Sequence, residues 1–165
     1  MTTKNDFTPE EWNTIVAAPS YAAILVVVSD FNVTYFKEVA AMAKAVMASI
    51  EGSKFELIKS VAGEYQDKDA MEAIKPELEK LRGLKDPTEL KSAMNEYVVK
   101  SAELVSAKSI EDGEAFRKWL VYLAEKAAEG SREGGFLGIG SVLVSEQEEE
   151  ALNELADALG VARKI

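Results

Sequence analysis

The stretch NVTYFKEVAAMAKAVMASI, residues 32–50, decides the fold class of this chain. Its apolar side chains recur every three or four residues, which is the spacing of one face of an α-helix and not of a β-strand. Lys37, Glu38 and Lys44 lie off that stripe, and Gly52 follows as a typical helix terminator. The stretch therefore predicts a helix with one buried face, formed by Val33, Phe36, Val39, Ala43, Val46 and Ile50.

Helix-start signals recur on both sides of this stretch. Thr8 and Glu11 form a capping box with Pro9 at the first helical position, and Phe7 and Trp12 suit a hydrophobic staple. The sequence Asp-Pro-Thr-Glu at 86–89 repeats this pattern, and a serine and a glutamate at 145 and 148 repeat the box. Together with the apolar spacing, these signals predict further helices over about 53–62, 67–82, 86–108, 114–129 and 145–159.

The most apolar stretch is residues 21–28, directly after Pro19. Its β-branched residues suit a strand, but no other long strand pattern is present to pair with it. We therefore predict a short helix at the centre of the fold, and we expect Pro19 to end or sharply turn the helix before it. The stretch is much shorter than the roughly 20 residues that span a bilayer, so we predict no membrane span.

Residues 134–144 combine glycines with apolar side chains, which is unusual for a helical protein. Two conformations remain open: a small β-hairpin, or an extended strap across the bundle near 136–144. The glycines match neither of two phosphate-binding patterns, Gly-x-x-x-x-Gly-Lys-Ser/Thr and Gly-x-Gly-x-x-Gly. An exposed apolar segment can also bind a partner, and the candidate interaction residues are Phe136, Leu137, Ile139 and Val142.

Overall we predict an all-α fold, a single-domain bundle of six to eight helices over residues 1–165.

Composition excludes several classes of function. The chain of 165 residues has no cysteine and no histidine, so it holds no thiolate metal site, no histidine-ligated zinc and no catalytic triad. Its net charge of −10 argues against binding to nucleic acid or to anionic lipid, and favours cationic partners. Residues 1–6 lack the features of a signal peptide, so we expect a cytoplasmic protein. Nothing in the pattern predicts a cofactor.

Clustered carboxylates are the candidate metal ligands. Asp112 and Glu114 open one predicted helix, and Glu146 and Glu148 open another. If the two helices are neighbours, these first turns could face the same direction and hold a divalent cation. The alternative is that the acids interact with the helix dipoles and with water.

A second acidic group lies at 64–72, where Glu64, Asp67, Asp69 and Glu72 could gather around Mg²⁺ or Ca²⁺. The calcium-loop pattern fails after the second aspartate, because Met71 stands at the next ligand position and no glycine follows. We expect these residues to form a solvated helix start.

Two resemblances cover parts of the chain. The C-terminal third resembles TerB-type tellurite-resistance domains. The residues that carry this resemblance are KSIEDGE at 108–114, the predicted helix after it, and VSEQE at 144–148 leading to Leu159 and Gly160. That resemblance implies an all-helical fold whose acidic helix starts take part in a metal-ion response. The start FTPEEW at 7–12 and the segment EGGFLG at 133–138 also resemble a set of uncharacterised bacterial helical proteins.

The interpretation that we favour is a non-catalytic module that binds another protein, or itself, through an acidic or strap-lined face. The first alternative is a divalent-cation-binding protein of TerB type. The second is a small enzyme or ligand carrier that uses a cavity in the bundle.

Overall fold

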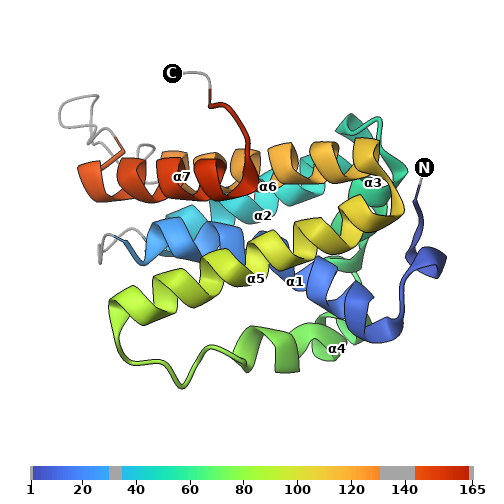
Figure 1. The fold of residues 1–165 in the computed structure, drawn as a ribbon, viewed down its shortest axis with the longest axis horizontal. Coiled ribbons are helices and arrows are strands. Elements are labelled where there is room, and N and C mark those ends of the chain that lie inside the picture. Colours follow the sequence, from blue (N-terminus) through green and yellow to red (C-terminus); the bar gives the residue numbers. More distant parts are fainter. Residues whose placement is uncertain (1, 30–34, 131–143, 164–165) are drawn as a thin grey trace.

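The computed structural model describes residues 2–29, 35–130 and 144–163, and these ranges are helical apart from their connections (Figure 1). The short 3-10 helix η1 (Lys4–Asp6) precedes the α-helices, which are α1 (Pro9–Val27), α2 (Tyr35–Gly52), α3 (Glu56–Glu64), α4 (Lys68–Glu79), α5 (Pro87–Lys108), α6 (Ile110–Gly130) and α7 (Glu146–Leu159). The described ranges thus hold seven α-helices and no strand. This confirms the prediction of an all-α fold with six to eight helices.

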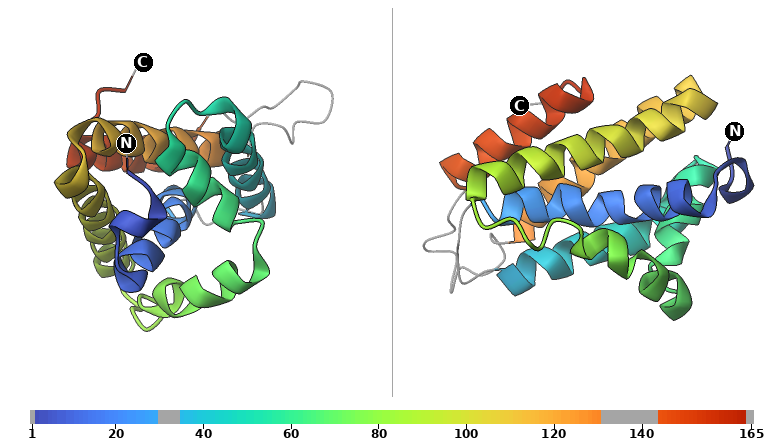
Figure 2. Two further views of the ribbon diagram at one scale, coloured as in Figure 1. Left: turned by 90° about the vertical axis from the view of Figure 1, so that its right-hand side faces the viewer. Right: turned by 60° about the horizontal axis from the view of Figure 1, so that its bottom comes forward.

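Helix α1 forms the centre of the molecule, and it contacts each of the helices α2 to α7. The end-on view of Figure 2 shows the other helices arranged around it. Its second half is the apolar stretch at 21–28, where Tyr21, Leu25 and Val26 are buried. The expectation of a central apolar helix is therefore confirmed, although that helix is not a separate element.

Pro19 does not end the first helix, so that prediction was wrong. Helix α1 runs through Pro19 to Val27, with every residue from 15 to 23 buried. Proline removes the hydrogen bond to the carbonyl four residues earlier and costs about 3 kcal/mol inside a helix. Packing on all sides of α1 outweighs that cost.

The buried face of α2 is rotated from the predicted one. Among the residues from 37 to 52, whose side chains the structure describes, Glu38, Met42, Ala45, Val46 and Ser49 are buried, whereas Ala43 is exposed. The expectation that Glu38 lies off the buried face was therefore wrong. Apolar spacing missed this face because two of its members are polar. Ser49 takes a buried position because its hydroxyl accepts a hydrogen bond from the Trp119 indole of α6 over 2.8 Å.

A glycine permits the close contact between α2 and α6. A Cβ atom at Gly130 would lie 2.8 Å from the Ala41 Cβ and 2.8 Å from the Lys37 carbonyl oxygen. Real Cβ atoms do not approach other atoms this closely. The two backbones therefore pack together only because position 130 carries no side chain.

Helices α5 and α6 form a tight hairpin joined at Ser109. The Ser109 hydroxyl accepts a hydrogen bond from the backbone N–H of Asp112, and its carbonyl accepts one from Gly113. Helix α6 consequently begins at Ile110, four residues before the predicted start. The predicted caps at Thr8, Asp86 and Ser145 are confirmed, and α7 ends at the left-handed Gly160. Helix α3 instead begins at Glu56, three residues after the predicted start, and α4 ends at Glu79, three residues before the predicted end.

Pro76 lies inside α4, and the helix continues through it to Glu79. After α7, Arg163 ties the end of the described chain to the bundle through ion pairs with Glu125 and Glu149.

None of the described helices is both long enough and apolar enough to cross a membrane.

Candidate functional site

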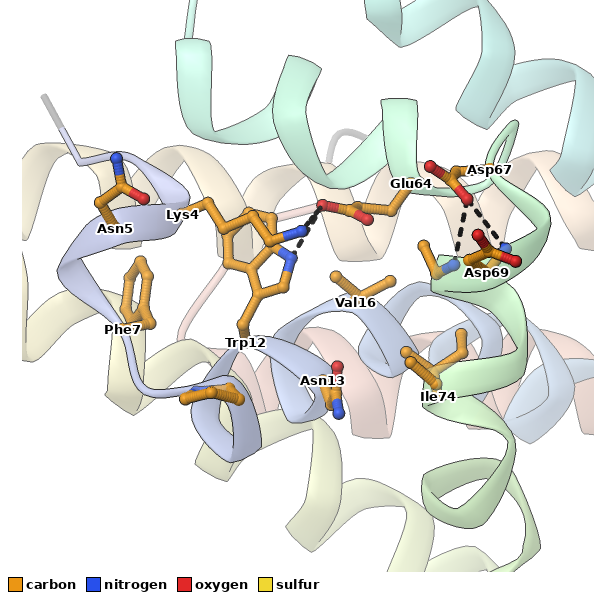
Figure 3. A pocket seen from close by; sticks show the side chains of 13 residues that line it. Lys4, Asn5, Phe7, Trp12, Asn13, Val16, Glu64, Asp67, Asp69 and Ile74 are labelled. Carbon is orange, nitrogen blue, oxygen red and sulfur yellow. Dashed lines mark hydrogen bonds and ion pairs between the residues drawn. The ribbon is translucent and has the colours of Figure 1, made fainter.

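A pocket of about 610 Å³ opens between η1, the first half of α1, the end of α3 and the start of α4 (Figure 3). Its lining combines apolar and charged side chains. The apolar lining is Phe7, Pro9, Trp12, Val16, Ala70, Ala73 and Ile74, and the charged lining is Lys4, Glu64, Asp67 and Asp69. Three carboxylates and one lysine give this pocket an excess of negative charge.

The apolar side of the pocket is fixed by the start of α1. The Thr8 hydroxyl accepts a hydrogen bond from the Glu11 N–H, and the Glu11 carboxylate accepts one from the Thr8 N–H. The predicted capping box is therefore present. The Phe7 and Trp12 rings then pack with their centroids 5.9 Å apart, which is the predicted staple. This local structure holds the Trp12 indole at the pocket wall.

Glu64, the last residue of α3, binds two donors from the opposite side of the pocket. Its Oε1 atom accepts hydrogen bonds from Lys4 Nζ at 2.7 Å and from Trp12 Nε1 at 3.0 Å. The Lys4 Nζ atom also lies 5.8 Å from the centroid of the Trp12 ring, within cation–π range. The pocket thus holds an ammonium group between a carboxylate and an indole.

Asp67 and Asp69 border the same pocket from the start of α4. Asp67 is the N-cap of α4, and its Oδ1 atom accepts hydrogen bonds from the backbone N–H groups of Asp69 and Ala70 at 2.8 and 3.2 Å. The expected helix start is therefore confirmed. In the part of the chain that the structure describes, no three acidic side chains converge closely enough to hold a metal ion.

The structure does not bring together the four acids that open α6 and α7. These two helices run in opposite directions, so Asp112 and Glu114 lie at one end of the bundle and Glu146 and Glu148 at the other (Figure 1). The alternative that these acids interact with water does not hold for Asp112 and Glu148, which are 4% and 3% exposed. Glu148 is buried because its carboxylate accepts a hydrogen bond from the Ser145 N–H as part of a cap.

Asp112 instead holds the start of the chain against α6. Its Oδ2 atom accepts hydrogen bonds from the Thr2 backbone N–H at 2.6 Å and from the Thr2 hydroxyl at 2.7 Å. Burial alone would raise the pKa of this carboxyl, but the hydrogen bonds from Thr2 and Ser109 outweigh burial and lower it below its ordinary value.

The half-buried side chain of Tyr97 has a structural role. Tyr97 donates its hydroxyl proton to Glu77 Oε2 at 2.7 Å, and Tyr21 donates to the Glu77 carbonyl at 2.6 Å. Burial and the adjacent glutamate raise the pKa of Tyr97 well above its ordinary value. The Tyr97 phenol is therefore a proton donor that joins α5 to α4, and not a base.

A smaller pocket of about 300 Å³ lies between α2 and α6. Alanines form much of its lining, together with Gly130 and with Lys44 and Lys126 at its edge. Tyr122 lies beside Lys126 at this pocket and is 40% exposed. The four candidate interaction residues Phe136, Leu137, Ile139 and Val142 lie outside the described residues.

Comparisons with protein-family models, with curated proteins and with solved structures find no match to this chain. The acidic group recognised in the sequence comprised Glu64, Asp67, Asp69 and Glu72, and the structure places the first three, but not Glu72, at one pocket. It missed Lys4 and Trp12 as partners of Glu64, because they stand 60 and 52 positions away and no local pattern relates them.

Proposed function

We propose that this protein is a non-catalytic interaction module, and that the pocket between η1, α1, α3 and α4 receives a basic and apolar segment of a partner protein. The observation that carries the proposal is the ammonium group seated on Glu64 and Trp12 beside an apolar wall. A partner segment that alternates lysines with large apolar residues offers the same chemistry.

Charge favours a cationic partner over an anionic one. The chain has a net charge of −10, and the pocket itself is lined by three carboxylates and one lysine. Such a field attracts a basic segment and repels an acidic one. The volume of about 610 Å³ is large enough to bury more than one side chain of the partner.

The arrangement of the carboxylates favours recognition over metal binding. Asp67 is used as a helix cap, and Glu64 is shared between an ammonium and an indole. The acids at the starts of α6 and α7 are separated along the bundle, and Asp112 and Glu148 satisfy backbone donors. These roles support the interaction module ahead of the divalent-cation alternative.

The test fills the pocket without changing its charge. Ala73 lines the pocket from α4 and is exposed, so Ala73→Trp places a bulky ring there while preserving the helix. The exposed Ala158 of α7 provides the matched control, Ala158→Trp. The probe is the peptide acetyl-Phe-Lys-Leu-Lys-Phe-amide, with its glutamate counterpart as the charge control.

We expect the lysine peptide to bind the wild type and Ala158→Trp equally, and Ala73→Trp at least about fivefold more weakly, the effect of losing roughly 1 kcal/mol of contact. Calorimetry or a fluorescence titration measures the difference. Equal binding to Ala73→Trp, or tighter binding of the glutamate peptide, would contradict the proposed function.

A further inference from the structure

We infer that Glu64 and Trp12 form a subsite for the primary ammonium of a partner lysine, and that Lys4 occupies this subsite from within the chain until the partner displaces it. The inference rests on the proposed function of the pocket, and it adds both the chemical identity of the recognised group and a means of regulation. Lys4 is in this sense an intramolecular competitor.

The contacts that Glu64 makes in the structure suit an ammonium group. Both donors that reach Glu64 converge on the single atom Oε1, and the Trp12 N–H fixes that atom from one side. A compact ammonium needs only one such oxygen together with the ring beside it. The planar fork of arginine binds best to two carboxylate oxygens that face it together. The subsite is therefore matched to lysine.

The contact of Lys4 with Glu64 can be exchanged for a contact with another ammonium group. The Lys4 side chain is 59% exposed and belongs to a helix of three residues, η1. Only the lysine end of this ion pair is exposed, so Lys4 can move into water when a second ammonium takes over its interaction with Glu64. Because the lysine is part of the chain, however, it is always present at the subsite and competes with any incoming cation.

The acceptor, in contrast, is held in place. The Glu64 side chain is only 14% exposed, and its indole partner Trp12 is buried against Phe7. If Lys4 departs, a largely desolvated carboxylate remains without its cation, which is unfavourable. A second ammonium that enters from solvent restores the lost interaction, and the apolar wall adds contacts for neighbouring side chains of the partner.

The experiment uses the full chain in a Trp119→Phe background, so that Trp12 is the remaining tryptophan and its fluorescence reports on the subsite. Lys4→Gln removes the internal ammonium. Lys68→Gln is the matched control, because Lys68 is exposed and adjoins Asp67 but does not line the pocket. Each variant is titrated with acetyl-Phe-Lys-Leu-Lys-Phe-amide and with its arginine counterpart.

We expect Lys4→Gln to bind the lysine peptide about two- to sixfold more tightly than its parent. The affinity rises because the peptide no longer has to displace Lys4 from a weak ion pair with Glu64. Lys68→Gln should change the affinity by less than about twofold, and the arginine peptide should bind more weakly than the lysine peptide. Adding Glu64→Gln to Lys4→Gln should remove the gain.

The outcomes separate this inference from the proposed function. If the parent and Lys4→Gln bind the lysine peptide with equal affinity, the pocket is a binding site but Lys4 is not a competitor, and the inference is overturned. If Lys68→Gln tightens binding as much as Lys4→Gln, the effect is general charge and the inference is equally overturned. If no variant binds the peptide, both proposals fail.

Discussion

At the scale of single residues, buried polar groups determine how this helical protein is held together. Ser49, Tyr97 and Asp112 are each partly or fully buried, and each forms a hydrogen bond with a residue of another helix or of the N-terminal segment. Burying such groups without a partner would cost more than any apolar contact they displace. Their partners lie 20 to 110 positions away in the sequence, so no local pattern identifies these side chains as buried.

Asp112 makes the stability of the protein depend on pH in a predictable direction. Its pKa is lowered in the folded state, so its contribution is present above the ordinary carboxyl pKa of about 4 and is lost as the pH falls below that value. We expect Asp112→Asn to reduce the free energy of unfolding by about 1–3 kcal/mol at pH 6, and by progressively less toward pH 3.

Urea denaturation at pH 6, 4 and 3 measures this dependence. Asp157→Asn, at an exposed position of α7, is the control and should change stability by less than about 0.5 kcal/mol at each pH. A difference between wild type and Asp112→Asn that stays constant from pH 6 to pH 3 would show that the carboxylate charge is not involved.

At the scale of helices, caps and apolar spacing predicted most elements correctly, because these signals are local. The starts at Thr8, Asp86 and Ser145 follow from side chains that bind backbone N–H groups within three residues. The errors arose where tertiary packing overrides a local rule. Pro19 is tolerated because α1 is surrounded by other helices, and the face of α2 is set by its close contact with α6.

The contact between α2 and α6 gives a prediction at this scale. We expect Gly130→Ala to lower the free energy of unfolding by about 1–3 kcal/mol, because the added methyl group would collide with Ala41 and with the backbone at Lys37. The control is Gly63→Ala within α3, where a Cβ atom meets nothing within 4 Å.

Gly63→Ala should instead raise stability by up to about 1 kcal/mol through its higher helix propensity. Thermal or chemical unfolding of the two variants compares them directly. If both substitutions stabilise the protein, the close packing of α2 on α6 is not as described.

At the scale of the whole molecule, the sequence predicted the fold class but only part of the site. Carboxylates at 64, 67 and 69 are close in sequence, so they could be recognised as a group. The pocket itself depends on how η1 and α1 pack against α3 and α4, which brings Lys4 and Trp12 to Glu64. Contacts between distant segments of this kind carry no periodicity and no motif, and only the folded chain reveals them.

The most direct test of the account is a chemical-shift titration of the ¹⁵N-labelled protein with acetyl-Phe-Lys-Leu-Lys-Phe-amide. We predict that the Trp12 indole N–H and the backbone amides of residues 64–74 shift most, since these groups border the pocket. The largest shifts around Lys44 and Tyr122 at the other pocket, or no shifts at millimolar peptide, would contradict it.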